Sequence, residues 1–303
     1  MGADGRPDHA PVLSVGLLPR AAPGSPFGAT PLGPLRARSK PGKRLVADAG
    51  LHVERAGVAV WCTLDRPPLN LLDPGVIHAV RAAFDAFAAD RATRVVVLTG
   101  SGRAFTAGMD VRVLRDLDAA RAMELITALH DAIDAVHRAP CPVIAAVNGA
   151  CLGAGFELAL ACDLRVAVAG APLGLPEVRV GVPSVIQAAL LPPLVGPGRA
   201  AELLLTGEPI TAERAHEWGL VNDVVPAERL RATVQARVDA ILACGPEAVR
   251  LQKELIVRWR ATDLRTAVRS GVDAFVAAYA TDEPFEGMSA FLEKRPPKFR
   301  SRR

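Results

Sequence analysis

The chain has 303 residues, of which half are hydrophobic and 22% are charged, a composition typical of a globular protein with a sizeable core. Aromatic residues make up only 4%, too few for the stacking platforms that bind single-stranded nucleic acids. The formal net charge is +4, but the middle of the chain is acidic, because residues 1–44 and 294–303 are both strongly basic.

The five cysteines form no CxxC pair, which argues against a disulfide framework and a zinc site and is typical of a reducing compartment. The most apolar stretch, residues 143–162, contains Asn148 and Glu157, so we expect no membrane span. The histidines show no metal-ligand spacing. These features predict a cytoplasmic protein with no metal site and no membrane partner.

Residues 1–48 are predicted to be a disordered N-terminal extension. Residues 1–44 contain eight prolines and seven glycines and show neither helical nor strand periodicity. The basic ends leave open a minor alternative, an RNA-binding protein that uses its tails. The scarcity of aromatic residues and the absence of an RNA-binding motif argue against it, so we expect no nucleic-acid partner.

Ordered structure is predicted from about Leu51. In chain order we expect a β-hairpin at 52–64, a helix that follows Asp73-Pro74, a strand at 94–99, a helix at 117–137, a strand at 142–147, a helix at 153–162 and a strand at 163–169. Beyond Pro183 the sequence is predicted to be helical. The recurrence of strand, turn and helix favours an α/β fold.

The late helices carry an apolar stripe at helical spacing. Its members are Leu264, Val268, Val272, Phe275 and Tyr279. A stripe of this kind is usually a core face, but in a late helical segment it can also be buried against a partner subunit.

Two segments that contain glycine, residues 103–110 and 148–159, each follow a predicted strand. Small residues at such turns allow a close approach of the backbone, and backbone N–H groups that point together form an oxyanion hole. The second segment also begins a helix, whose first N–H groups and dipole favour developing negative charge. Each cluster alone is equally well explained as a tight turn.

Two glutamates accompany these segments. Glu157 lies in the first turns of the predicted helix 153–162, and its apolar surroundings mean that its carboxylate needs a partner or a proton. Glu177 follows Pro176 in another apolar stretch. Two carboxylates, one water and an oxyanion hole suit proton transfer beside a thioester carbonyl. A charge that complements the helix dipole, or a salt bridge, explains Glu157 equally well.

The spacing Gly153-x-Gly155-x-x-Leu158 begins like the dinucleotide-binding fingerprint. However, Leu158 stands where Gly or Ala is needed for close packing, and Glu177 follows a proline rather than a strand, so this interpretation is disfavoured. The sequence contains no P-loop, GxSxG, HExxH or EF-hand pattern.

A series of short motifs runs through residues 51–299. They are TLDRP at 63–67, VVLTG at 96–100, AFTAGMD at 104–110, PVIAAVNG at 142–149, ELA at 157–159, CD at 162–163, PE at 176–177, LTG at 205–207, GLV at 219–221 and GMSAF at 287–291. In this order the motifs resemble the enoyl-CoA hydratase/isomerase (crotonase) family. The resemblance implies acyl-CoA thioester substrates and an α/β fold, a ββα spiral with a C-terminal helical trimerisation region.

The resemblance also implies a division of the chain. After the extension at 1–48, a spiral core with the active site is expected at 49–226 and a helical oligomerisation region at 227–303. The expected assembly is a homotrimer or a dimer of trimers. No cofactor is expected, because coenzyme A is part of the substrate.

The resemblance assigns roles to single residues. Glu157 and Glu177 are the expected catalytic acids, and the N–H groups of Met109 and Ala154 are the expected oxyanion hole. The expected substrate-binding positions are Ala107, Gly108, Asp110, Gly153, Pro176 and Ser184, with Arg66 and Lys294 as candidates for binding the anionic CoA.

Having both glutamates favours an enoyl-CoA hydratase, a lyase of fatty acid and lipid metabolism. Ala154 departs from the family's usual glycine, and a positive φ there would cost on the order of 1 kcal/mol. Ser184 also stands where hydratases usually have glycine, and residues 185–192 differ from the usual segment that shapes the acyl pocket. Double-bond isomerisation, dehydration of an unusual acyl-CoA and thioester hydrolysis therefore remain alternatives.

Overall fold

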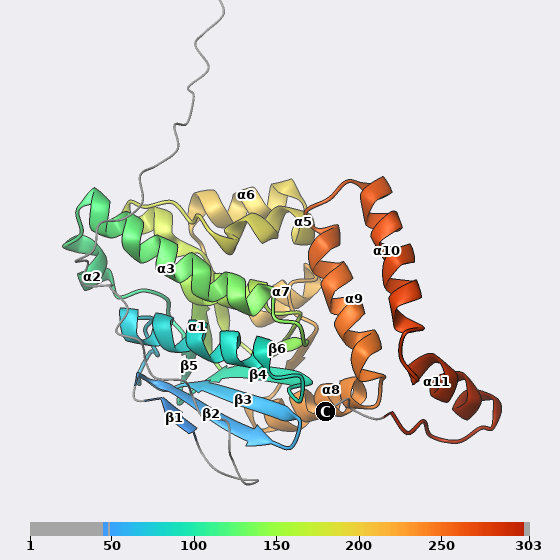
Figure 1. The fold of residues 1–303 in the computed structure, drawn as a ribbon. Helices are drawn as coiled ribbons and strands as arrows, with labels where there is room; N and C mark the ends of the chain where they lie inside the picture. Colours follow the sequence, from blue (N-terminus) through green and yellow to red (C-terminus); the bar gives the residue numbers. More distant parts are fainter. Residues whose placement is uncertain (1–44, 48, 300–303) are drawn as a thin grey trace, which may run out of the picture. The chain divides into compact units, whose positions relative to one another are not determined.

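The computed structural model describes residues 45–47 and 49–299 (Figure 1). The disorder predicted for residues 1–48 therefore falls almost entirely outside the described residues, apart from strand β1 at Leu45–Ala47. Within the described part of the chain, no helix is both long and apolar enough to cross a bilayer.

The main sheet has seven strands in the order β1-β2-β3-β4-β6-β8-β11. After β1 its strands are β2 (Leu51–Ala56), β3 (Ala59–Leu64), β4 (Val95–Gly100), β6 (Val143–Val147), β8 (Leu164–Val168) and β11 (Asp223–Val225). The first three strands pair antiparallel and the others parallel, so the predicted hairpin at the start of the fold is confirmed.

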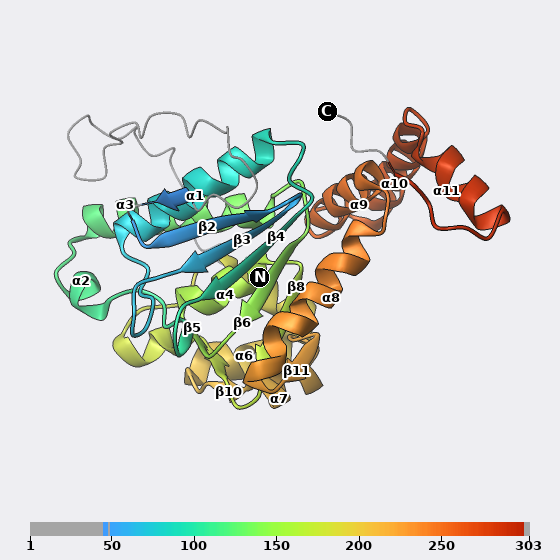
Figure 2. The ribbon, with the colours of Figure 1, turned by 90° about the horizontal axis from the view of Figure 1, so that it is seen from below.

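The central strands are apolar because both faces of the sheet are covered. All five residues of β6 and the first four of β4 are buried. Helix α1 (Pro74–Ala89) packs with α3 (Ala119–His137) on one side, and α8 (Leu230–Leu242) crosses the other side against β4, β6 and β8 (Figures 1 and 2). Coverage on both faces explains why these strands lack alternation of polar and apolar residues.

The predicted helix starts are confirmed. Asp73 caps α1 by accepting a hydrogen bond from the Val76 N–H at 2.9 Å, with Pro74 in the first turn. The remaining helices are α2 (Val111–Arg115), α4 (Ala154–Ala161), α5 (Leu191–Val195), α6 (Pro197–Thr206), α7 (Ala212–Glu217), α9 (Pro246–Trp259), α10 (Leu264–Ala278) and α11 (Glu283–Leu292), with 3-10 helices η1 (Pro176–Val180), η2 (Gln187–Leu190) and η3 (Ala227–Arg229).

A second sheet was not predicted from the sequence. Its order is β10-β9-β7-β5, formed by β5 (Ala104–Thr106), β7 (Ala150–Leu152), β9 (Pro172–Gly174) and β10 (Ile210–Thr211). These strands have two or three residues each, too short to show a strand period. With β10 and β11, strands also occur beyond Pro183, so the expectation of helices alone there is wrong. This small sheet places the turns before α2 and α4 side by side.

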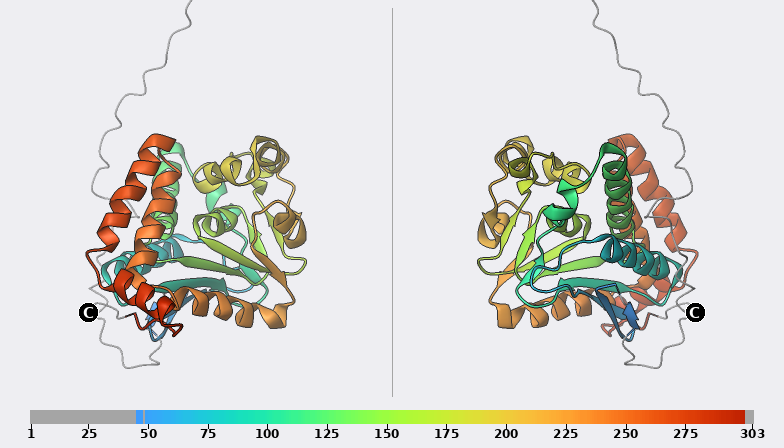
Figure 3. Two further views of the ribbon diagram at one scale, coloured as in Figure 1. Left: turned by 90° about the vertical axis from the view of Figure 1, so that its right-hand side faces the viewer. Right: turned by 90° about the vertical axis from the view of Figure 1, so that its left-hand side faces the viewer.

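The C-terminal helices leave an apolar face uncovered. Helix α10 packs along α9, and α11 continues beyond it (Figure 3). All five residues of the predicted stripe on α10 are more than half exposed, as are Phe285, Phe291 and Leu292 on α11. Within the described chain this stripe is therefore not a core face.

Candidate active site

A cavity of about 570 Å³ lies where α2, α3 and the start of α4 meet the segment 177–185. Five of the site residues expected from the sequence line it: Met109, Ala154, Glu157, Glu177 and Ser184. The rest of the lining is largely apolar, and it comes from α2, α3 and residues 182–185. The cavity thus combines a few polar groups with an apolar wall, as small-molecule sites commonly do.

Glu157 is buried in the first turn of α4. Every residue of this eight-residue helix is buried, and Glu157 itself is only 3% exposed. Its Oε1 accepts a hydrogen bond from the Ala188 N–H at 3.0 Å. Burial, with the charge of Glu177 nearby, raises the pKa of Glu157 to about 7, although hydrogen bonds from backbone N–H groups oppose the shift. A carboxyl with this pKa can give or take a proton at neutral pH.

Glu177 approaches the beginning of the same helix. It lies in η1, directly after Pro176, and a Cβ atom added to Gly153 would lie 2.8 Å from its Oε1. Its other oxygen, Oε2, accepts a hydrogen bond from the Ser184 hydroxyl at 2.7 Å. A side chain at residue 153 would displace the Glu177 carboxylate, and the positive φ of 56° at this position also favours glycine.

Two backbone N–H groups lie at the same cavity. Ala154 is the first residue of α4, so its N–H has no partner within the helix. Among the described residues, neither this N–H nor that of Met109 donates to an acceptor. A Cβ atom on Gly108 would lie 3.3 Å from the Ala154 nitrogen, so the two turns are in contact. Free N–H groups in this arrangement suit an oxyanion that forms between them.

Ala154 does not have the positive φ that would make alanine costly at this position. Among the described residues other than glycine, only Asn70 and Lys294 have a positive φ. The left-handed position is the preceding residue, Gly153, whose φ is 56°. Alanine at 154 is therefore compatible with the helix start, and the requirement for glycine falls one residue earlier.

Other expected substrate-binding residues adjoin the cavity without lining it. The Ala107 N–H donates to the carbonyl of Leu69, and Asp110 caps α2 and pairs with Arg112. Gly108 has a φ of 85°, and a Cβ atom added there would lie 2.8 Å from the Leu152 carbonyl oxygen. These residues and Pro176 belong to the turns that hold the cavity-lining residues in place.

Arg66 and Lys294 are not among the residues that line the cavity. Arg66 pairs with Asp73 at 3.4 Å, and Lys294 follows the end of α11. The expectation that they bind CoA stays a prediction.

Sequence reasoning missed two parts of the site. The first is the Ala188 N–H, a backbone donor that no sequence signal reveals. The second is the apolar wall from α3, where Ala122, Leu125, Ile126 and Leu129 recur at helical spacing and line the cavity. Their periodicity was visible in the sequence, but it is the same for a core face and for a ligand-facing one.

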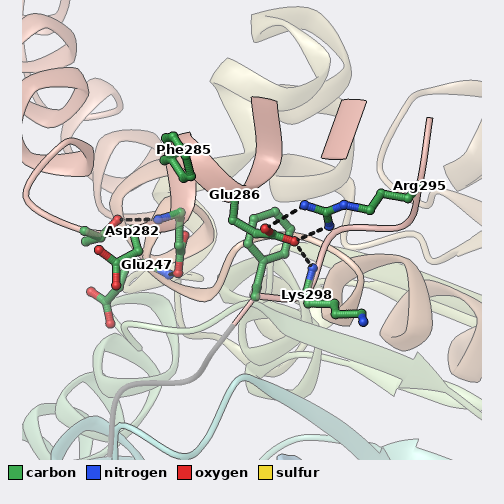
Figure 4. A pocket seen from close by; sticks show the side chains of 9 residues that line it. Glu247, Asp282, Phe285, Glu286, Arg295 and Lys298 are labelled. Carbon is green, nitrogen blue, oxygen red and sulfur yellow. Dashed lines mark hydrogen bonds and ion pairs between the residues drawn. The ribbon is translucent and has the colours of Figure 1, made fainter. Parts of the chain in front are cut away.

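A second cavity, of about 760 Å³, lies at the start of α11 and the residues after it (Figure 4). Glu286 points toward Arg295 and Lys298 there, accepting hydrogen bonds from the Arg295 guanidinium and the Lys298 N–H. These bonds, chiefly the one from Arg295, lower the pKa of Glu286 to about 2. This carboxylate stays ionised and paired, so it is not suited to proton transfer. Within the described chain, no group of three or more acidic, His or Cys side chains is placed to hold a metal.

Comparison with known proteins agrees with this geometry. The sequence profile of the enoyl-CoA hydratase/isomerase family matches residues 54–302. A crotonyl-CoA hydratase from Syntrophomonas wolfei is 39% identical over 242 residues, which cover 79% of this chain and 93% of the relative. A short-chain-enoyl-CoA hydratase from Clostridium acetobutylicum is 33% identical over 246 residues, 80% of this chain and 94% of the relative.

Solved structures show the same similarity. The crystal structure of an enoyl-CoA hydratase from Bacillus anthracis superposes with a TM-score of 0.80 at 35% identity, covering 84% of this chain and 100% of its own. The structure of Pseudomonas aeruginosa DspI also gives a TM-score of 0.80, at 34% identity over 83% of this chain and 97% of its own.

Proposed function

The chain belongs to the enoyl-CoA hydratase/isomerase family, and we propose that it catalyses the reversible addition of water across the C2=C3 double bond of a 2-enoyl-CoA thioester. The protein is accordingly an enzyme, a hydro-lyase. The observation that carries the proposal is the meeting of two carboxyl groups and two free backbone N–H groups at one cavity.

In the proposed reaction, the thioester oxygen accepts hydrogen bonds from the N–H groups of Met109 and Ala154. Water adds to C3 and gives one proton to the ionised member of the Glu157–Glu177 pair, while the protonated member gives its proton to C2. Negative charge develops on the thioester oxygen as an enolate, and losing one such N–H donor typically costs about 3 kcal/mol. The raised pKa of Glu157 supports a pair that shares one proton. The step balances with water and two carboxyl groups, so we propose no metal or redox cofactor.

The test uses the purified protein and a panel of 2-enoyl-CoA thioesters from short to long. We expect products that have gained one water, and the corresponding 3-hydroxyacyl-CoA should lose one water in the reverse assay. A panel left unchanged in both directions would contradict the proposal.

A second candidate is another acyl-CoA reaction of the same family, namely isomerisation, dehydration of an unusual acyl-CoA or thioester hydrolysis. It is favoured by the Ser184 hydroxyl on Glu177 and by the unusual segment 185–192. The same mass measurement separates these reactions, because an isomer keeps its mass, a dehydration product loses one water and hydrolysis releases free CoA.

We also propose a homotrimer or a dimer of trimers held together through α10 and α11. The exposed apolar stripe on α10 supports this, because large apolar side chains gathered on an exposed helix face often mark an interaction surface. Sedimentation should give a trimeric or hexameric mass, and replacing Val272 and Phe275 by Asp should give a smaller species. A wild-type monomer at micromolar concentration would contradict the assembly.

The substrate class supports a place in fatty acid metabolism, and the free cysteines support a cytoplasmic location. We expect subcellular fractionation to recover the protein with the soluble enzymes of acyl-CoA metabolism. Recovery in an oxidising compartment would contradict this placement.

A further inference from the structure

One short segment contacts both carboxyl groups of the site, but with different donors. The Ser184 hydroxyl donates to Glu177 Oε2 at 2.7 Å, whereas the Ala188 N–H donates to Glu157 Oε1 at 3.0 Å. The chain turns back after η1, with the Val182 N–H donating to the Glu177 carbonyl at 3.2 Å. This turn brings Ser184 over the Glu177 side chain.

From this arrangement we propose that Ser184 is a positioning residue for Glu177. Its hydroxyl holds the carboxylate beside Gly153 at the start of α4. The inference rests on the proposed function, since it assigns Ser184 a part in the same proton transfer, and it changes the expected role of Ser184 from substrate binding to the control of a catalytic acid.

The chemistry of the contact supports this role. A hydroxyl that donates to a carboxylate stabilises its charge, and 2.7 Å is a typical length for such charge-assisted bonds. Glu157, in contrast, is buried and accepts hydrogen bonds from backbone N–H groups. Its pKa of about 7 means that it can hold a proton near neutral pH. Ser184 therefore fixes the position of one acid, while backbone N–H groups fix the position of the other.

Few other charged groups face Glu177. Glu157 faces it from α4, and Asp118 from the start of α3 lines the same cavity, with its side chain paired to Arg121 at 3.0 Å. Within η1, Arg179 turns away toward Glu208 and the Thr206 carbonyl. Among the described residues, no lysine or arginine lines the cavity. The side-chain hydrogen bond that Glu177 accepts there comes from the Ser184 hydroxyl.

The first experiment compares kcat and kcat/KM for the wild type, Ser184→Ala and Ser184→Thr with one 2-enoyl-CoA. Removing the hydroxyl should lower kcat about tenfold with little change in KM. It should lower kcat/KM by about the same factor, because a misplaced Glu177 carboxylate weakens the transition state and not substrate binding. Ser184→Thr keeps the hydroxyl and should restore both quantities toward the wild type.

Val185→Ala is the matched control, since Val185 lines the same cavity without a hydrogen bond to either acid from its side chain. It should change KM and leave the Glu177 carboxylate beside Gly153. A Ser184→Ala enzyme with the wild-type kcat would overturn the proposal. So would a covalent acyl group found on Ser184 by mass spectrometry, which would make the serine a nucleophile.

The second experiment does not depend on turnover. Crystal structures of the wild type and Ser184→Ala are compared at the Glu177 side chain. The Glu177 carboxylate should lie beside Gly153 in the wild type and leave that position in Ser184→Ala, because it loses the hydrogen bond from the serine hydroxyl. If the wild type fails to hydrate every thioester but the carboxylate moves in the variant, the function falls and the positioning role stands. An unmoved carboxylate in an active enzyme removes the positioning role alone.

Discussion

Two cavities in the described part of the chain each contain a buried or half-buried glutamate, Glu157 in one and Glu286 in the other, and these two glutamates have opposite properties. Glu286 faces Arg295, and its pKa falls to about 2. Glu157 lies among apolar residues with another carboxylate nearby, and its pKa rises to about 7. The larger cavity therefore contains a charge that is already neutralised, and the smaller one contains a group that can exchange protons. The neighbours of a carboxyl group, more than the size of the cavity around it, indicate which cavity can support chemistry.

The largest test of this contrast replaces each acid by its amide. Glu157→Gln and Glu177→Gln should each lower kcat at least about a thousandfold, because an amide cannot transfer the proton. Glu286→Gln is the matched control and should keep the wild-type kcat. The measurement is initial rate with a 2-enoyl-CoA, with circular dichroism to verify the fold. Equal losses at all three positions would remove the distinction between the cavities.

The next test addresses the N–H pair. Gly108 has a φ of 85°, and a Cβ atom there would lie 2.8 Å from the Leu152 carbonyl oxygen and 3.3 Å from the Ala154 nitrogen. Gly108→Ala should therefore displace the proposed oxyanion hole and lower kcat about a hundredfold. Gly57→Ala also places alanine at a positive φ, 65°, but with nothing within 4 Å. It should lose stability and keep kcat. Similar kcat values for both variants would contradict the proposed oxyanion hole.

The raised pKa of Glu157 predicts a pH-dependent cost in stability. Between pH 4.5 and 7 the folded protein retains a proton that the unfolded chain releases, so the wild type loses stability as pH rises through this window. Glu157→Gln has no such proton, and its stability relative to the wild type should rise by about 3 kcal/mol across the same window. Denaturant unfolding at pH 4.5 and at pH 8 measures the difference. A constant difference would mean that Glu157 titrates normally.

The smallest effect is expected at the second cavity, with the opposite sign. Because the pKa of Glu286 is lowered from 4.5 to about 2, its bonds with Arg295 stabilise the fold above pH 4.5, and this stability is lost as pH falls toward 2. Glu286→Gln should melt at a lower temperature than the wild type at pH 6, and the two melting temperatures should converge at acidic pH. Parallel curves at all pH values would show that Glu286 contributes nothing through its charge.

Local sequence determined the long elements of the fold. Asp73-Pro74 followed by apolar residues at helical spacing is sufficient to begin α1, and the unbroken apolar run of β4 can only be buried between two covered faces. The ordered motifs also indicated the family and both glutamates. These features depend on residues close together in the chain, so they can be read without knowing the rest of the structure.

Tertiary structure decided how the residues of the site come together. Strands β5, β7 and β9 are too short to carry a pattern, yet their pairing is what brings Met109 beside Ala154 and Glu177 over Gly153. The proton affinity of Glu157 likewise depends on burial and on a carboxylate twenty positions away. Contacts of this kind arise from the packing of segments that are distant in the chain, so no local sequence pattern specifies them. The sequence determined only the residue types that these contacts use.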